Sequence, residues 1–210
     1  MNVYGKNDEG EATYPYEQQF RGVKEEDLKL NQDATKTSGF PFFSILIWSL
    51  FATVISIVVP FIFGLVSPQQ MQDFYTGWAL HQNGQIYTDY YGSNGLLYYL
   101  LTYLSQGSIL FALVEWVALF GAGIFLFKSA NTLTGQRGQA RQLLAIFYLL
   151  VASLGFGGSY AMIVAMPFLF YAFSLVADYL KNPINDKGFL LVGMSLALAF
   201  FLSPIPTLLF

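Results

Sequence analysis

Cysteine is absent from the 210 residues, and histidine occurs only once, at His81. Without cysteine the chain has no disulfide, no thiolate metal site and no cysteine nucleophile. A single histidine rules out paired-histidine metal motifs, and the carboxylates form no tight cluster along the sequence. No cofactor is therefore predicted, although a divalent metal shared by Asp73 and Asp89 is left open.

Charged residues are also scarce, at 11% of the chain, against 55% hydrophobic and 18% aromatic residues. A soluble domain carries about 25% charged residues. The composition is therefore that of a polytopic membrane protein with the lipid bilayer as its surroundings. The five basic residues beyond position 41 stand in short, separate segments and form no basic stripe, so nucleic acid is not expected as a partner.

Residues 1–41 differ from the rest because they hold 13 charged side chains, five basic and eight acidic, and no sustained apolar period. This composition predicts a disordered tail. The first apolar run begins near Phe42, is about 25 residues long, and shows no short apolar core with a small-residue cleavage site. We therefore expect an uncleaved membrane anchor rather than a signal peptide.

Long apolar runs predict about five membrane crossings, because a bilayer core of about 30 Å needs roughly 20 helical residues. Glycines at 155, 157 and 158 divide one overlong run into two helices. The expected helices are 42–66, 108–127, 140–156, 160–180 and 188–202. The predicted fold is all-α, that of a polytopic integral membrane protein. Because the sequence stops in apolar residues at Thr207 to Phe210, we expect the helices of residues 108–210 to belong to a longer, truncated set.

The segment 67–107 contains no lysine or arginine. The basic residues of the apolar part fall in the other connections, at Lys128, Arg137, Arg141, Lys181 and Lys187. Basic loops stay in the cytoplasm by the positive-inside rule. The sequence therefore predicts a multi-pass plasma-membrane protein with a cytoplasmic N-terminus and an external loop at 67–107.

This loop is expected to hold two amphipathic helices at the membrane interface. Ser67, Pro68 and Gln70 predict a capping box that starts the first helix, and Gly84 predicts its end. Apolar side chains then recur at helical spacing from Met71, and Asp73 falls on the opposite face. The second helix is expected from Leu96 to Leu104, after a polar turn at 87–95.

An anchor span, an external helix that carries Asp73 near its start, then Gly84, Tyr87 and Asp89, a turn, and the aromatic segment 96–99 form a recognisable order. This order resembles the first-loop region of polytopic C-type (GT-C) glycosyltransferases, over about residues 42–130. The resemblance implies a lipid-phosphate-linked sugar as donor, a cavity at the outer membrane boundary, and a first-loop carboxylate that acts as general base. By position that carboxylate is Asp73, and Asp89 is a secondary polar contact.

Other side chains complete the predicted site. Glu115 lies within the second span, where a carboxylate is costly and is by default a functional candidate. It is a candidate contact for donor or acceptor, and the alternative is that it sits protonated against a neighbouring helix. His81 is a candidate for the donor phosphate. The aromatic side chains of the turn are candidates for stacking on a sugar ring, namely Tyr87, Tyr90 and Tyr91. The structural alternative is that Asp73 only solvates the polar face of a surface helix.

The resemblance therefore implies glycosyl transfer from a polyprenyl-phosphate-linked sugar to an envelope polysaccharide or glycolipid acceptor at the outer membrane face. Attack by a hydroxyl on an anomeric carbon needs a base within hydrogen-bond reach, and a carboxylate beside apolar aromatics suits that task. Two alternatives belong to other classes. One is a transporter or lipid-linked oligosaccharide flippase, with Glu115 as an intramembrane relay. The other is a noncatalytic membrane scaffold.

Overall fold

The computed structural model describes residues 5–6, 12–13, 40–85, 94–106, 108–154, 160–181 and 187–204. It divides into two units, residues 1–41 and residues 42–210. In the first unit, strand β1 (Gly5–Lys6) pairs antiparallel with β2 (Ala12–Thr13). The prediction of a disordered tail otherwise falls on residues outside this description.

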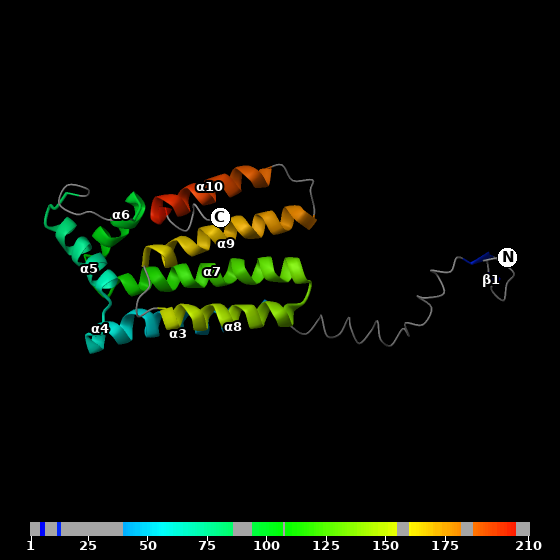
Figure 1. Ribbon diagram of the computed structural model, residues 1–210, viewed down its shortest axis with the longest axis horizontal. Helices are drawn as coiled ribbons and strands as arrows, with labels where there is room; N and C mark the ends of the chain where they lie inside the picture. Colours follow the sequence, from blue (N-terminus) through cyan, green and yellow to red (C-terminus); the bar gives the residue numbers. More distant parts are fainter. Residues whose placement is uncertain are drawn as a thin grey trace. The chain divides into compact units, whose positions relative to one another are not determined.

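In the second unit, every described secondary-structure element is a helix. Helices from distant parts of the chain lie side by side, and two shorter ones gather at one end (Figure 1). The side-by-side elements are α3 (Phe42–Thr53), η1 (Val54–Val58), α4 (Val59–Phe63), α7 (Phe111–Thr134), α8 (Arg137–Leu154), α9 (Tyr160–Lys181) and α10 (Lys187–Leu202). The shorter helices are α5 (Pro68–His81) and α6 (Leu96–Ser105). The all-helical prediction is thus confirmed for this unit.

Three helices of the described residues are long and apolar enough to cross a membrane, namely 42–63, 111–134 and 161–181. Many large apolar side chains of the unit are exposed, as in Phe43, Ile62 and Val117, which suits contact with lipid. Helices α8 and α10 lie alongside the three. At 1.5 Å per residue their 18 and 16 residues extend about 27 and 24 Å. Five crossings stay a prediction.

The second span is longer than predicted. We expected it to end at 127, before Lys128, but α7 continues to Thr134. Lys128 is accommodated because its Nζ lies 2.7 Å from Oδ2 of Asp178 on α9, in a half-exposed ion pair. Gly135, with a left-handed φ of 67°, ends the helix. Lys128 therefore marks the end of the apolar run, but the helix itself continues for six more residues.

Within the core of the bundle, α7 and α8 approach each other closely at one tyrosine. Tyr148 is fully buried, and its hydroxyl donates to the backbone carbonyl of Leu119 at 2.9 Å. Gly123 leaves room for this ring, since a Cβ there would stand 2.0 Å from the Tyr148 hydroxyl. The buried hydroxyl thus has an acceptor, and the small residue allows the two helices to pack closely.

Candidate functional site

The helix that carries Asp73 begins with the predicted capping box. The amide of Ser67 donates to Oε1 of Gln70 at 3.1 Å, and the amide of Gln70 donates to the Ser67 hydroxyl at 3.2 Å. Two backbone donors of the first turn are thereby satisfied. At the other end Asn83, not Gly84, takes the left-handed conformation, with φ of 68°. The amide of Gly84 donates to the Ala79 carbonyl at 3.0 Å.

Asp73 is buried against α6 rather than solvated, with 5% of its surface exposed. Its Oδ2 accepts from the Tyr98 hydroxyl at 3.0 Å, and its Oδ1 accepts from the Asn94 amide at 3.3 Å. Both donors come from the second half of the segment 67–107. The alternative that Asp73 only solvates a helix face is therefore wrong, because the face that carries it is the one that packs inside the protein.

The second half of the loop is in turn fixed to α10. The amide of Gly95, the residue before α6, donates to the carbonyl of Leu202 at 3.0 Å. A Cβ on Gly95 would stand 2.0 Å from the carbonyl oxygen of Phe201. The segment that supplies both donors to Asp73 therefore contacts the backbone of α10 at Gly95, where only glycine fits.

The remaining loop candidates are placed less fully. Tyr87, Asp89, Tyr90 and Tyr91 lie outside the described residues. His81 is exposed on the last turn of α5, and its ring centroid is 5.6 Å from that of Tyr103 on α6. No group of three or more His, Asp or Glu residues that could hold a metal occurs within the part of the chain that the structure describes.

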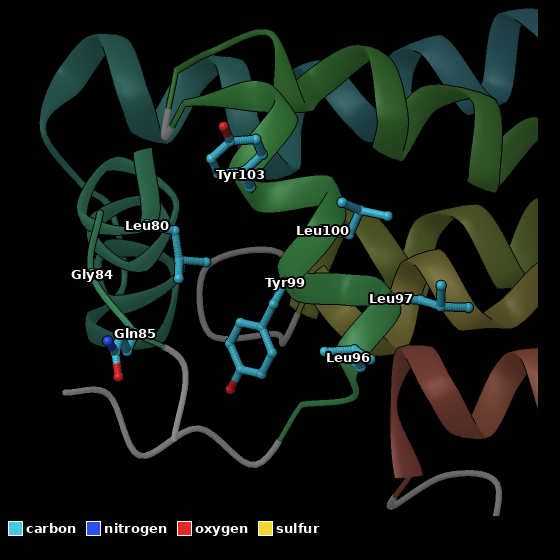
Figure 2. A pocket seen from close by; sticks show the side chains of 8 residues that line it. All are labelled: Leu80, Gly84, Gln85, Leu96, Leu97, Tyr99, Leu100 and Tyr103. Carbon is cyan, nitrogen blue, oxygen red and sulfur yellow. The ribbon is translucent and has the colours of Figure 1, made fainter. Parts of the chain in front are cut away.

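A cavity of about 600 Å³ lies between α5 and α6. Figure 2 shows the Tyr99 side chain projecting from α6 into this space, with Leu80 of α5 on the other side. The lining residues are mostly apolar and comprise Leu80, Gly84, Gln85, Leu96, Leu97, Tyr99, Leu100 and Tyr103. Its volume is within the range of small-molecule sites. Asp73 does not line it and sits two helical turns before Leu80 on α5.

A second cavity, of about 460 Å³, lies on the other side of α6. It is bounded by α6, α7, α9 and α10, within the apolar part of the bundle. Leu97 and Leu100 line both cavities, so α6 forms a shared wall between them. The lining residues are Leu97, Leu100, Leu101, Val114, Val117, Ala118, Gly121, Val164, Pro167, Phe168, Leu198 and Leu202.

Glu115 is fully buried in α7 and lines neither cavity. The Ser56 hydroxyl donates to its Oε1. Among the described residues its Oε2 has no hydrogen-bond partner. The structure therefore pairs this carboxylate with the first span and not with a cavity wall.

Sequence reasoning missed the contacts that Ser56, Asn94 and Tyr98 make in the site. It also predicted Gln70 only as part of the capping box and missed its hydrogen bond to Ser56. Tyr98 gives no sequence signal of its role, because tyrosine gathers at membrane boundaries whatever its partner. A usable signal existed for Ser56, which stands four residues before Pro60. Its carbonyl therefore loses the usual helical donor, since proline has no N–H.

A model of the protein family described as "Putative competence-induced protein Ccs4 N-terminal domain" matches residues 30–210. No curated protein and no solved structure matches the chain. This family name refers to induction during competence and names no chemistry. The resemblance to GT-C glycosyltransferases accordingly stays a prediction.

Proposed function

Because this chain belongs to the Ccs4 N-terminal domain family, whose description names no reaction, we propose its function from the geometry of the site. The proposal is glycosyl transfer from a polyprenyl-phosphate-linked sugar to an envelope saccharide or glycolipid, with Asp73 as general base. The observation that carries it is a buried, doubly hydrogen-bonded carboxylate on α5, a helix that also contributes to the wall of an apolar cavity two turns further along.

The hydrogen bonds to Asp73 suit a base that must be held in place. Tyr98 and Asn94 each bind one carboxylate oxygen, which fixes the plane of the group. A carboxylate has about four lone-pair positions, so it can hold a substrate hydroxyl in addition to protein donors. Proton transfer to such a positioned group supplies about 100- to 10,000-fold in rate.

The two cavities suit the lipid part of the donor. Both have mostly apolar walls, and α6 separates them while also supplying Tyr98 to Asp73. A lipid-linked sugar would place its apolar chain in these cavities and its polar, reacting head toward Asp73. Between Gly64 and Leu110 the chain has no lysine or arginine. The donor phosphate would then be bound by His81, by tyrosine hydroxyls, or by backbone amides.

The transfer experiment uses proteoliposomes that contain the full chain and polyprenyl-phosphate [¹⁴C]glucose, galactose or mannose in turn, with a lipid extract as acceptor source. We expect one of these donors to lose its label to a new saccharide or glycolipid product. Movement of an intact labelled lipid between leaflets would instead favour the flippase alternative. Absence of both product and lipid movement would favour the scaffold.

The proposed location of the site can be tested separately, because the chain has no native cysteine. Gln82 and Gln136 are both exposed, the first after α5 and the second between α7 and α8 at the opposite end. We expect Gln82→Cys to react with a membrane-impermeant maleimide on intact cells. The matched Gln136→Cys should react only after permeabilisation. The reverse pattern would place the loop in the cytoplasm and contradict an external reaction.

A further inference from the structure

The first span contains a five-residue π-helical segment, η1, just before Pro60. In an α-helix the carbonyl of Ser56 would accept from residue 60, and proline has no N–H to donate. Nε2 of Gln70 donates to this carbonyl instead, at 3.2 Å. Segments of this kind often mark functional positions. Here the irregularity creates a backbone acceptor that binds the start of α5.

Gln70 holds the start of α5 with three hydrogen bonds. Two form the capping box with Ser67, and the third reaches Ser56 in the first span. Gln70 is fully buried. Asp73 follows three residues later, so both side chains lie on the same buried face of α5. The direction in which α5 leaves its first turn therefore decides where the Asp73 carboxylate lies.

The same serine connects Gln70 to Glu115. The Ser56 hydroxyl donates to Oε1 of Glu115, while the Ser56 carbonyl accepts from Gln70. A buried hydroxyl needs an acceptor, and the Glu115 side chain supplies one to Ser56. Glu115 of α7 thus constrains Ser56, the residue whose backbone carbonyl binds Gln70 at the start of α5.

We infer that Glu115 is a positioning residue for Asp73, acting through Ser56 and Gln70. The inference rests on the proposed role of Asp73. It replaces the substrate contact that the sequence predicted for Glu115, since the structure pairs this carboxylate with Ser56 of the first span. The hydrogen bonds from Tyr98 and Asn94 to Asp73, at 3.0 and 3.3 Å, tolerate little displacement. A shift of α5 by about 1 Å is enough to cost a reaction on the order of 100-fold.

The test compares Glu115→Gln with Glu115→Leu. A glutamine amide keeps an oxygen that accepts from Ser56, whereas leucine has similar size and no acceptor. We expect Glu115→Leu to lower kcat by tenfold or more with an unchanged KM for the labelled donor. Glu115→Gln should stay within about threefold of the parent chain. A residue that carries a proton or binds substrate by its charge would fail in both variants.

A distance measurement tests positioning without any activity. Spin labels on Met71→Cys in α5 and Leu133→Cys in α7 occupy exposed positions of the cysteine-free chain. Glu115→Leu should shift or broaden their distance distribution, and Glu115→Gln should leave it unchanged. Gln70→Leu should have the effect of Glu115→Leu, and the two together should add little, because they break one chain of contacts.

An unchanged distance in the Glu115→Leu chain overturns the inference, whatever the activity. Equal loss of transfer in both Glu115 variants with unchanged distances overturns it as well. If the parent chain transfers no sugar but the distance responds as described, the role of Asp73 fails and the link from Glu115 to α5 stands. Where the Glu115→Leu chain does not accumulate, Ser56→Ala removes the same hydrogen bond with a smaller change and carries the same expectations.

Discussion

The Asp73→Asn chain should reach the membrane at parental levels and transfer sugar about 100- to 10,000-fold more slowly. The amide cannot take a proton from an attacking hydroxyl. It keeps an oxygen for the Tyr98 hydroxyl, and the Asn94 side-chain amide can turn so that its own oxygen accepts from the new NH₂ group. The local hydrogen bonds therefore survive while the chemistry is lost.

Asp178→Asn is the matched control, because it makes the same chemical change at the opposite end of the bundle. Asp178 forms a half-exposed ion pair with Lys128 and accepts from Thr132 at 3.3 Å. Exposed ion pairs contribute about 0 to 1 kcal/mol, so we expect parental transfer. Rates are measured with the same labelled donor. Full activity of Asp73→Asn would exclude this carboxylate as the base and leave it as a link between α5 and α6.

Tyr98→Phe separates these two roles of Asp73. It removes one hydrogen bond to the carboxylate and leaves the ring packed against Phe111, with centroids 5.8 Å apart. The expected loss of stability is about 1.5 to 3 kcal/mol, because the lost hydrogen bond is to a buried carboxylate. The expected loss of transfer is smaller than that of Asp73→Asn, because a base that is less well held can still accept a proton.

The parts of the structure that follow local rules could be predicted from the sequence. The capping box of Ser67 and Gln70, the start of α6 at Leu96 and the start of the first span at Phe42 all depend on neighbours within one helical turn. Nearby residues alone determine such features. This is why the division of the segment 67–107 into two helices is confirmed.

The contacts of the site could not be predicted, because they join residues far apart in sequence. Tyr98 is 25 residues from Asp73, and Ser56 is 59 residues from Glu115. Amphipathic spacing predicts Asp73 on the polar face of α5, and one alternative was that this face only meets water. In the structure it meets α6, whose tyrosine and preceding asparagine satisfy the buried carboxylate. The periodicity predicted which face of α5 carries Asp73, but not that this face packs against α6.

The Gly95→Ala chain should be less stable than the parent by about 3 kcal/mol or more. The added Cβ would stand 2.0 Å from the Phe201 carbonyl oxygen and 2.3 Å from its carbon. Both are backbone atoms, so no change of rotamer relieves the overlap. Separation of α6 from α10 would also break the hydrogen bond from Gly95 to the Leu202 carbonyl. Heating the detergent-solubilised chain and measuring the monodisperse fraction should show a midpoint lower by roughly 5 to 10 °C.

Gly193→Ala is the matched control, since Gly193 lies inside α10 with no atom within 4 Å of an added Cβ. Alanine favours a helix over glycine by about 1 kcal/mol, so this variant should melt at or above the parental midpoint. Gly95→Ala should also slow transfer, because the same displacement moves Tyr98 and Asn94 away from Asp73. Equal midpoints for the two variants would mean that α10 moves aside at no cost. In that case the backbone contact at Gly95 would not hold the carboxylate in place.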